Sequence, residues 1–318
     1  MKQQFFEQEH GEVWQQIEDS LENPSRGDNS KILAEHYMLL CQHLALAKER
    51  LYDAALVERL NNLVLGVYRE LYRYRAETRL NFYAFFKRDF PLAIYRHRYF
   101  ILASFLVMVL PGMIAGTWTY VDEDAVYSML EASQVRGVER MYDPEARKLG
   151  REREADTDIF MFGFYIKNNI SVAFRCFAGG MVLGIGTLLV LFFNGMFMGS
   201  IAGHLTRLDY VDTFYPFVVG HGSFELTAIV FSGAAGLRLG YAILHPGQSS
   251  RLDSLRQAGR DVVPMLYGIV LMLIIAAFLE AFWSSSTSLT IAVKYSVGAV
   301  LWVLVLLYSF SGRRHESR

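Results

Sequence analysis

Long apolar blocks fill most of this chain after residue 98. They cover residues 99–119, 170–205, 217–244, 262–283 and 289–310. About 20 apolar residues span the hydrocarbon core of a bilayer, so each block is long enough to cross one. The pattern predicts an all-α fold: a polytopic helical membrane protein with five to six membrane segments and a soluble helical domain before them.

We expect the membrane core to occupy residues 168–312. One of its apolar blocks is too long for an ordinary crossing. As a straight helix, residues 170–205 would measure roughly 54 Å at 1.5 Å per residue. We expect a broken helix or a helical hairpin there, with Gly184-Ile185-Gly186 or Asn194-Gly195 as the turn. A hairpin gives six crossings in total, and a single broken helix gives five.

A different pattern fills residues 1–95, where apolar residues recur at helical spacing between charged ones. Two or three amphipathic helices that share a core fit this spacing. Residues 23–29 supply a break between helices. At the end of the domain, residues 82–96 mix aromatic and basic side chains, which indicates either an interfacial helix or a membrane-proximal turn of the domain. The apolar positions are Leu33, Tyr37, Leu40, Leu44, Leu51, Leu56, Leu60, Leu63, Val67 and Leu71.

The placement of lysine and arginine predicts the side that each flank faces. Residues 59–98 hold nine basic and three acidic side chains, and the loop at 246–260 and the tail at 313–318 are also basic. Residues 120–167 hold eleven acidic and seven basic side chains. Because basic flanks stay in the cytoplasm, we expect residues 120–167 to be extracytoplasmic and the other three segments to be cytoplasmic. If both termini lie on the cytoplasmic side of the membrane, the number of crossings is even, and six is expected. Five crossings would place the basic tail on the outer side.

Composition excludes several classes of protein. The net charge is −1, so no global signal for nucleic-acid binding exists. Cys41 and Cys176 are the two cysteines, and their separation argues against a disulfide framework or a zinc knuckle. Residues 1–14 are charged and polar and contain no continuous apolar region, so no cleavable signal peptide is expected. We predict no cofactor.

Six polar or ionisable side chains interrupt the apolar run between residues 168 and 240. Each costs roughly 2–4 kcal/mol at bilayer depth unless it finds a partner. Such groups therefore lie at helix contacts or in functional cavities. They are Asn168, Asn169, Asn194, His204, His221 and Glu225.

His221 and Glu225 lie four residues apart and share one helix face. Together with His204 they could bind a metal, or they could hold a proton for transfer. No HExxH motif occurs, and Ser223 and Ser232 lack the sequence context of a serine nucleophile. We therefore predict no catalytic or metal site and interpret the six polar residues as a polar clasp between helices. A proton or ligand pathway and a catalytic site are the alternatives.

A second charged pair lies in the last two blocks. Glu280 and Lys294 are about equally far from the short turn at residues 284–288, so an antiparallel hairpin would bring them level. Opposite charges there compensate each other. In the alternative, each lies near the interface and the lysine extends outward to water.

Glycines recur four residues apart within the apolar blocks. Without side chains at these positions, helices approach closely enough for backbone contact. The spacing predicts helix-packing faces, either within one chain or between two copies of it. The glycines are Gly180, Gly184, Gly195, Gly199, Gly203, Gly236 and Gly240.

The order of these motifs resembles the stage II sporulation protein M family over residues 95–312. It consists of Asn168-Asn169, Asn194-Gly195, the run Gly220-His221-Gly222-Ser223-Phe224-Glu225 and Leu279-Glu280-Ala281-Phe282. The extra helical domain resembles the longer branch of that family. In spore formers, the resemblance implies a polytopic membrane protein that works with peptidoglycan-degrading partners during engulfment. In the long branch, it implies MoxR-type ATPases and other membrane proteins as neighbours.

We therefore expect an integral membrane scaffold or assembly component of a cell-envelope protein complex, without enzyme activity. Its expected place is the cytoplasmic (inner) membrane of a bacterium, and its partners are the lipid bilayer, other membrane or envelope proteins and a second copy of the chain. Residues 120–158 are polar enough to order only on a partner. The alternative is a transporter or channel-like protein with a midplane site at His221 and Glu225. An intramembrane hydrolase is a further alternative.

Overall fold

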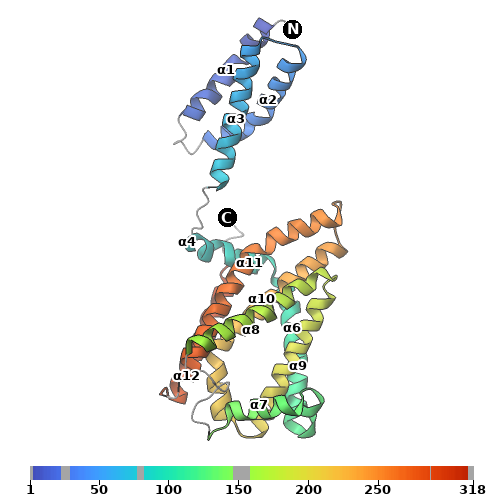
Figure 1. Cartoon of the computed structure of the whole chain (residues 1–318), viewed down its shortest axis with the longest axis vertical. Helices are drawn as coiled ribbons and strands as arrows, with labels where there is room; N and C mark the ends of the chain where they lie inside the picture. Colours follow the sequence, from blue (N-terminus) through green and yellow to red (C-terminus); the bar gives the residue numbers. More distant parts are fainter. Residues whose placement is uncertain (1–2, 23–28, 77–81, 146–157, 287, 314–318) are drawn as a thin grey trace. The chain divides into compact units, whose positions relative to one another are not determined.

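In the computed structural model, residues 3–22, 29–76, 82–145, 158–286 and 288–313 are described. They are almost entirely helical, and no strand occurs among them (Figure 1). The chain divides into two compact units, Met1–Asn81 and Phe82–Arg318. The all-α fold with a helical N-terminal region is thus confirmed.

The N-terminal unit contains three helices: α1 (Gln3–Glu22), α2 (Asn29–Glu49) and α3 (Ala54–Ala76). The predicted apolar stripes of α2 and α3 face a shared core, and α1 adds Phe6, Trp14 and Ile17 to it. Leu51 is the exception among the described positions, because it lies in the turn after α2 and is 90% exposed. The side chain of Leu71 lies outside the described residues. The buried members of the stripes are Leu33, Leu40, Leu56, Leu60, Leu63 and Val67.

The sequence pattern suggested a boundary between the two units at residue 95. In the structure the boundary lies at residue 81. The helical turns α4 (Phe82–Ala84), η1 (Phe85–Asp89) and α5 (Phe90–Arg96) belong to the second unit. Phe90 is buried there with its ring against Gly268, and the hydroxyl of Tyr308 donates to the carbonyl of Phe86 at 2.8 Å. Residues 86 and 90 are thus anchored to the second unit, whereas Phe82 and Tyr83 are exposed. The interpretation of this segment as a turn of the N-terminal domain is wrong.

Five helices of the second unit are long and apolar enough to cross a membrane by length and composition. Each corresponds to one of the predicted apolar blocks. They are α6 (Arg98–Val121), α9 (Ile185–Arg207), α10 (Val211–Leu244), α11 (Arg251–Phe278) with its continuation η4 (Leu279–Ser284), and α12 (Ile291–Phe310).

The overlong block breaks after residue 178. α8 (Asp158–Ala178) and the short η3 (Gly179–Met181) are followed by Leu183 and Gly184, both with positive φ, and then by α9. A left-handed backbone favours glycine, which explains why the turn lies at Gly184, the first of the two predicted turns. The other predicted turn is wrong, because Asn194 and Gly195 lie within α9. α8 also begins twelve residues before the predicted block, inside the segment expected to be extracytoplasmic.

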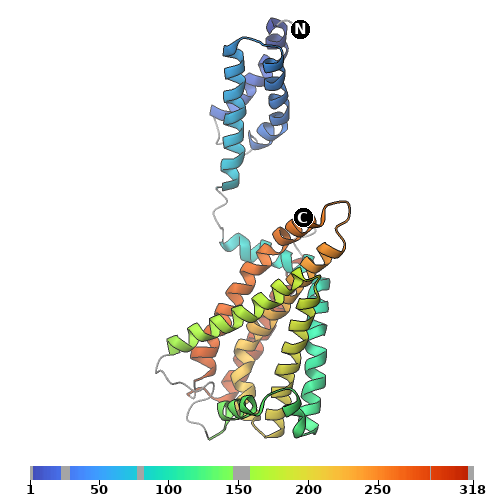
Figure 2. The ribbon, with the colours of Figure 1, turned by 45° about the vertical axis from the view of Figure 1, so that its right-hand side comes forward.

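Glycine contacts define the directions of these helices. Gly112 and Gly116 of α6 face Gly195 and Gly199 of α9 in the same order, so the two helices run parallel. α8 and α10 also run parallel, because the hydroxyl of Ser232 donates to the carbonyl of Ala173 and Gly236 lies against Cys176. After α6 the chain therefore returns through α8 before it enters α9, and α8 is antiparallel to both. Figure 2 shows α8 slanting across its neighbours.

Both flanks of the membrane unit lie at one end. Gly312, just beyond α12, lies against the backbone of Pro91, just before α6. The chain therefore passes through the unit an even number of times: through α6, α8, α9, α10, α11 and α12. We call the end with Arg96 and Arg98 the basic end, and the opposite end, with residues 122–124, the acidic end. This geometry agrees with six crossings and contradicts five with the tail at the acidic end.

The acidic segment is partly folded without a partner. It contains η2 (Asp124–Ser128) and α7 (Ala132–Tyr142), which begins with a capping box formed by Glu131 and Gln134. Val126, Leu130 and Val135 form a small buried cluster against Ile201 of α9. The expectation that this segment orders only on a partner is wrong for residues 122–145, because a few apolar residues at suitable spacing suffice when a helix end is available for packing. Residues 146–157 lie outside the described residues.

Candidate functional site

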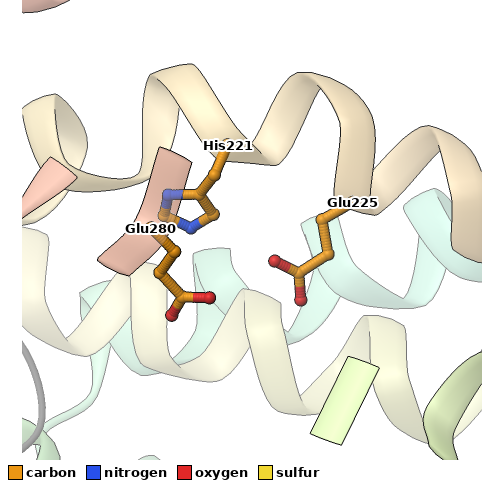
Figure 3. A group of neighbouring side chains, drawn as sticks. All are labelled: His221, Glu225 and Glu280. Carbon is orange, nitrogen blue, oxygen red and sulfur yellow. The ribbon is translucent and has the colours of Figure 1, made fainter. Parts of the chain in front are cut away.

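Three ionisable side chains converge inside the membrane unit. His221 and Glu225 project from α10, and Glu280 projects from η4. One ligand atom of each lies within 4.8 Å of the others (Figure 3). His221 is buried, and the two carboxylates are partly buried. We call this set the His-Glu-Glu group.

Local sequence explains why α10 and η4 approach here. Gly220 has no side chain, and the ring of Trp283 occupies the space that a Cβ would need. The π-helix η4 widens the helical turn, and Glu280 and Ser284 on it both reach His221. π-helical turns are rare and frequently lie at functional sites, and this one ends α11.

Hydrogen bonds fix the imidazole of His221. Its Nδ1 lies 2.9 Å from the hydroxyl of Ser284, and Lys294 Nζ donates to the carbonyl of Ser284 at 2.8 Å. Figure 3 shows the ring directed toward the carboxylates of Glu225 and Glu280. With Nδ1 engaged by Ser284, Nε2 is the nitrogen that remains for a ligand.

Asn169 of α8 borders the same group. Its side chain is 2% exposed and interacts with Glu225. Asn168 donates to its Oδ1 at 3.1 Å, while its own Nδ2 has no partner within hydrogen-bond distance among the described residues. A buried N–H without a close acceptor costs about 1–3 kcal/mol. The Nδ2 group lies beside Glu225, so a small movement of that carboxylate toward it would satisfy the donor.

Two of the predicted polar residues lie elsewhere. His204 Nε2 is 2.8 Å from Glu139 of α7, and the amide of Asn194 donates to the carbonyl of Val190 within α9. His204 therefore pairs with a carboxylate near the acidic end rather than completing a group with His221. Glu280 is the third member of the group instead. The sequence did not indicate this contact, because 55 residues separate Glu280 from Glu225.

Lys294 is buried and bonded to the carbonyl of Ser284, at the other end of η4 from Glu280. Its inward position speaks against the alternative in which it extends to water. A direct charge pair between Glu280 and Lys294 stays a prediction.

The model of the stage II sporulation protein M family matches residues 103–285. The chain belongs to this family. Residues 4–73 match a separate family model described as a domain of unknown function. An uncharacterized protein of Methanocaldococcus jannaschii is 26% identical over 125 residues, which cover 39% of this chain and 70% of that protein. No solved structure matches the chain.

The glycines of this stage II sporulation protein M family member are used within one chain. α6 and α9 meet through Gly112, Gly116, Gly195 and Gly199, and a Cβ at Gly203 would meet the backbone of α6. A second pair of faces joins the α8–α9 turn to α10. There Gly180 lies against Gly236, and Gly184 lies against Gly240. The sequence left open packing within one chain or between two copies of it, and these contacts lie within one chain.

Small hydroxyl side chains fasten the same helices, a feature that the sequence analysis missed. Ser104 of α6 donates to the carbonyl of Val230 at 2.7 Å, and Thr187 of α9 donates to that of Cys176 at 2.7 Å. Thr119 donates to the carbonyl of Ser200 at 3.0 Å. For Thr119 and Thr187 the available signal was a packing glycine three residues away in the sequence, Gly116 or Gly184. Ser104 lies against Gly233 of another helix, so the sequence held no local signal for it.

Proposed function

We propose that this multi-pass membrane protein is an assembly component of a cell-envelope protein complex in the cytoplasmic (inner) membrane of a bacterium. A separate helical unit, Met1–Asn81, precedes the membrane unit and offers a second surface for partners. The partners are other membrane or envelope proteins, including MoxR-type ATPases, with a second copy of the chain as a further partner. We assign it no enzyme activity and no nucleic-acid partner.

The observation that carries this proposal is the turn between α2 and α3. Leu51 there is 90% exposed and has a φ of 51°. A left-handed backbone costs an L-residue roughly 1–2 kcal/mol, and glycine is the usual residue just after a helix. Leu51 borders a shallow cavity of about 470 Å³ that Ala47 and Val57 also line. We infer from the exposed leucine and its unfavourable backbone that this turn contacts a partner.

The substitution Leu51→Gly separates this explanation from a structural one. We expect it to raise the melting temperature of the N-terminal unit, since glycine removes the backbone strain. At the same time it should reduce the recovery of envelope proteins crosslinked to tagged full-length protein in cells, by about tenfold if the contact contributes ~1.4 kcal/mol. Asn62→Ala, at an exposed position of α3, is the matched control.

Unchanged recovery of every crosslinked envelope protein in Leu51→Gly, with the expected gain in stability, would contradict a partner contact at this turn. The acidic segment allows a second test of the same function. Removal of residues 122–145 should lose at least one crosslinked partner, because α7 and η2 form a folded surface at the acidic end.

A transporter or channel-like protein is the second candidate, and the His-Glu-Glu group supports it. Ionisable side chains inside a membrane unit often line pathways for ions or protons. Purified protein in liposomes would then move protons or cations under a gradient, and Glu225→Gln would abolish this movement. Absence of any flux in the wild type would exclude this candidate.

A further inference from the structure

We propose that His221, Glu225 and Glu280 bind one divalent transition-metal cation of the class of Zn²⁺. The three side chains offer an imidazole nitrogen and two carboxylate oxygens from two separate elements, α10 and η4 (Figure 3). Imidazole and carboxylate together suit such cations. This site is independent of the partner contacts proposed above.

The spacing of the ligand atoms fits the formation of a metal site. The three atoms lie within 4.8 Å of one another. Ligand bonds of about 2.0–2.2 Å to a tetrahedral zinc place its ligand atoms roughly 3.3–3.5 Å apart. Binding therefore requires the ligand atoms to close by at most about 1.5 Å, a movement within reach of a change of glutamate rotamer. Three protein ligands leave one position for water.

The surroundings of His221 resemble those of a metal ligand. A metal-ligating histidine usually donates its other ring N–H to a neighbouring acceptor, which fixes the ring. Ser284 occupies that position 2.9 Å from Nδ1, and Lys294 holds the carbonyl of Ser284. Nε2 then has its lone pair available, and the ring is directed toward both carboxylates.

Charge also favours a cation. Two carboxylates lie close together on largely apolar elements, and Lys294 donates to the carbonyl of Ser284 on η4. A divalent cation neutralises both carboxylates at once. The Nδ2 of Asn169, which has no partner among the described residues, would then donate to Glu225 or to a water on the metal. This second observation lies outside the His-Glu-Glu group itself.

Equilibrium dialysis of purified full-length protein against Zn²⁺, with metal analysis, tests the site. We expect about one zinc per chain in the wild type. In His221→Gln, Glu225→Gln and Glu280→Gln we expect the affinity to fall by more than the roughly 10- to 100-fold that loss of an outer-shell partner causes, because each variant removes a ligand. The matched control is His204→Gln, which removes a buried histidine beside Glu139 in the same unit. It should bind zinc like the wild type.

The proposal is overturned if the wild type binds no stoichiometric zinc, if the three variants bind it as tightly, or if His204→Gln loses it equally. X-ray absorption of the zinc-loaded wild type guards against variants that fail to fold. A shell of nitrogen and oxygen at about 2.0–2.2 Å supports the site. A sulfur ligand would assign the metal to Cys41 or Cys176 and would also overturn it.

Discussion

At the scale of single residues, Trp14 and His43 form the centre of the N-terminal core. Both side chains are buried, and Trp14 Nε1 donates to His43 Nδ1 at 3.1 Å. His10 stacks on the ring of His43 with centroids 4.1 Å apart. Since Nδ1 accepts this hydrogen bond, the neutral ring carries its proton on Nε2. A second proton would remove the acceptor that Trp14 needs.

The N-terminal unit should therefore lose stability in acid. Burial lowers the pKa of His43, and the charge of His10 lowers it further, against an opposite effect of Glu9. This stabilisation is fully present above the unfolded-state pKa of about 6.5 and is lost as the pH falls through the lower folded-state pKa. Thermal unfolding of residues 1–81, followed by circular dichroism between pH 8 and 5, would measure this loss of stability. In His43→Gln the melting temperature should fall less over the same pH range. A melting temperature that rose below pH 6.5 would contradict this prediction.

At the scale of secondary-structure elements, the pair α6 and α9 shows what the glycine spacing specifies. The two helices run parallel, and their backbones touch along Gly112, Gly116, Gly195 and Gly199. No side chain fits between them, so alanine at one of these positions would force the helices apart. Overpacking of this kind typically costs about 1–3 kcal/mol.

Gly199→Ala should lower the melting temperature of the purified protein in detergent, because its Cβ would meet the backbone of Gly112. Gly259→Ala is the matched control. Gly259 lies in α11, and a Cβ there meets no atom within 4 Å. The control should be neutral or stabilising by about 0.4–1 kcal/mol, since alanine limits the unfolded chain more than glycine does. Equal melting temperatures for the two variants would show that α6 and α9 do not pack as described.

At the scale of the whole molecule, the membrane unit has both of its flanks at the basic end. Gly312 lies against Pro91, and Tyr308 bonds to Phe86 across the same contact. Arg238 of α10 pairs with Asp261 of α11 at 3.4 Å, and Asp261 lines a cavity together with Arg96 and His97. These contacts place the loop between α10 and α11 at that end.

Reporter fusions test this topology and its proposed orientation together. Fusions after residues 81, 247 and 313 should report the cytoplasm, and a fusion after residue 145 should report the opposite side. The basic flanks give the physical reason for the orientation, and the even number of passes requires the three sites to agree. A cytoplasmic signal after residue 81 combined with an external signal after residue 313 would exclude six crossings.

Local patterns carried much of the prediction of the fold. The stripe that includes Leu33, Leu60 and Val67 follows a helical period, and burial follows directly from it. The turn at Gly184 and the close approach of Gly195 depend only on a missing side chain. The N-terminal boundary was misplaced, because aromatic residues such as Phe90 are apolar and interfacial at once, and their packing partner Gly268 lies far away in the sequence.

Composition and spacing of four residues or fewer were enough to predict the helices, the glycine faces of α9 and α10 and the polar residues that needed partners. Which of these residues meet follows from contacts between helices far apart in the sequence. The tertiary structure paired His204 with Glu139 and brought Glu280 to His221 and Glu225. That choice depends on the register of α10 against η4, which the small Gly220 and the π-helical turn set together. Register between distant helices is a sum of many contacts, and no short stretch of the sequence encodes it.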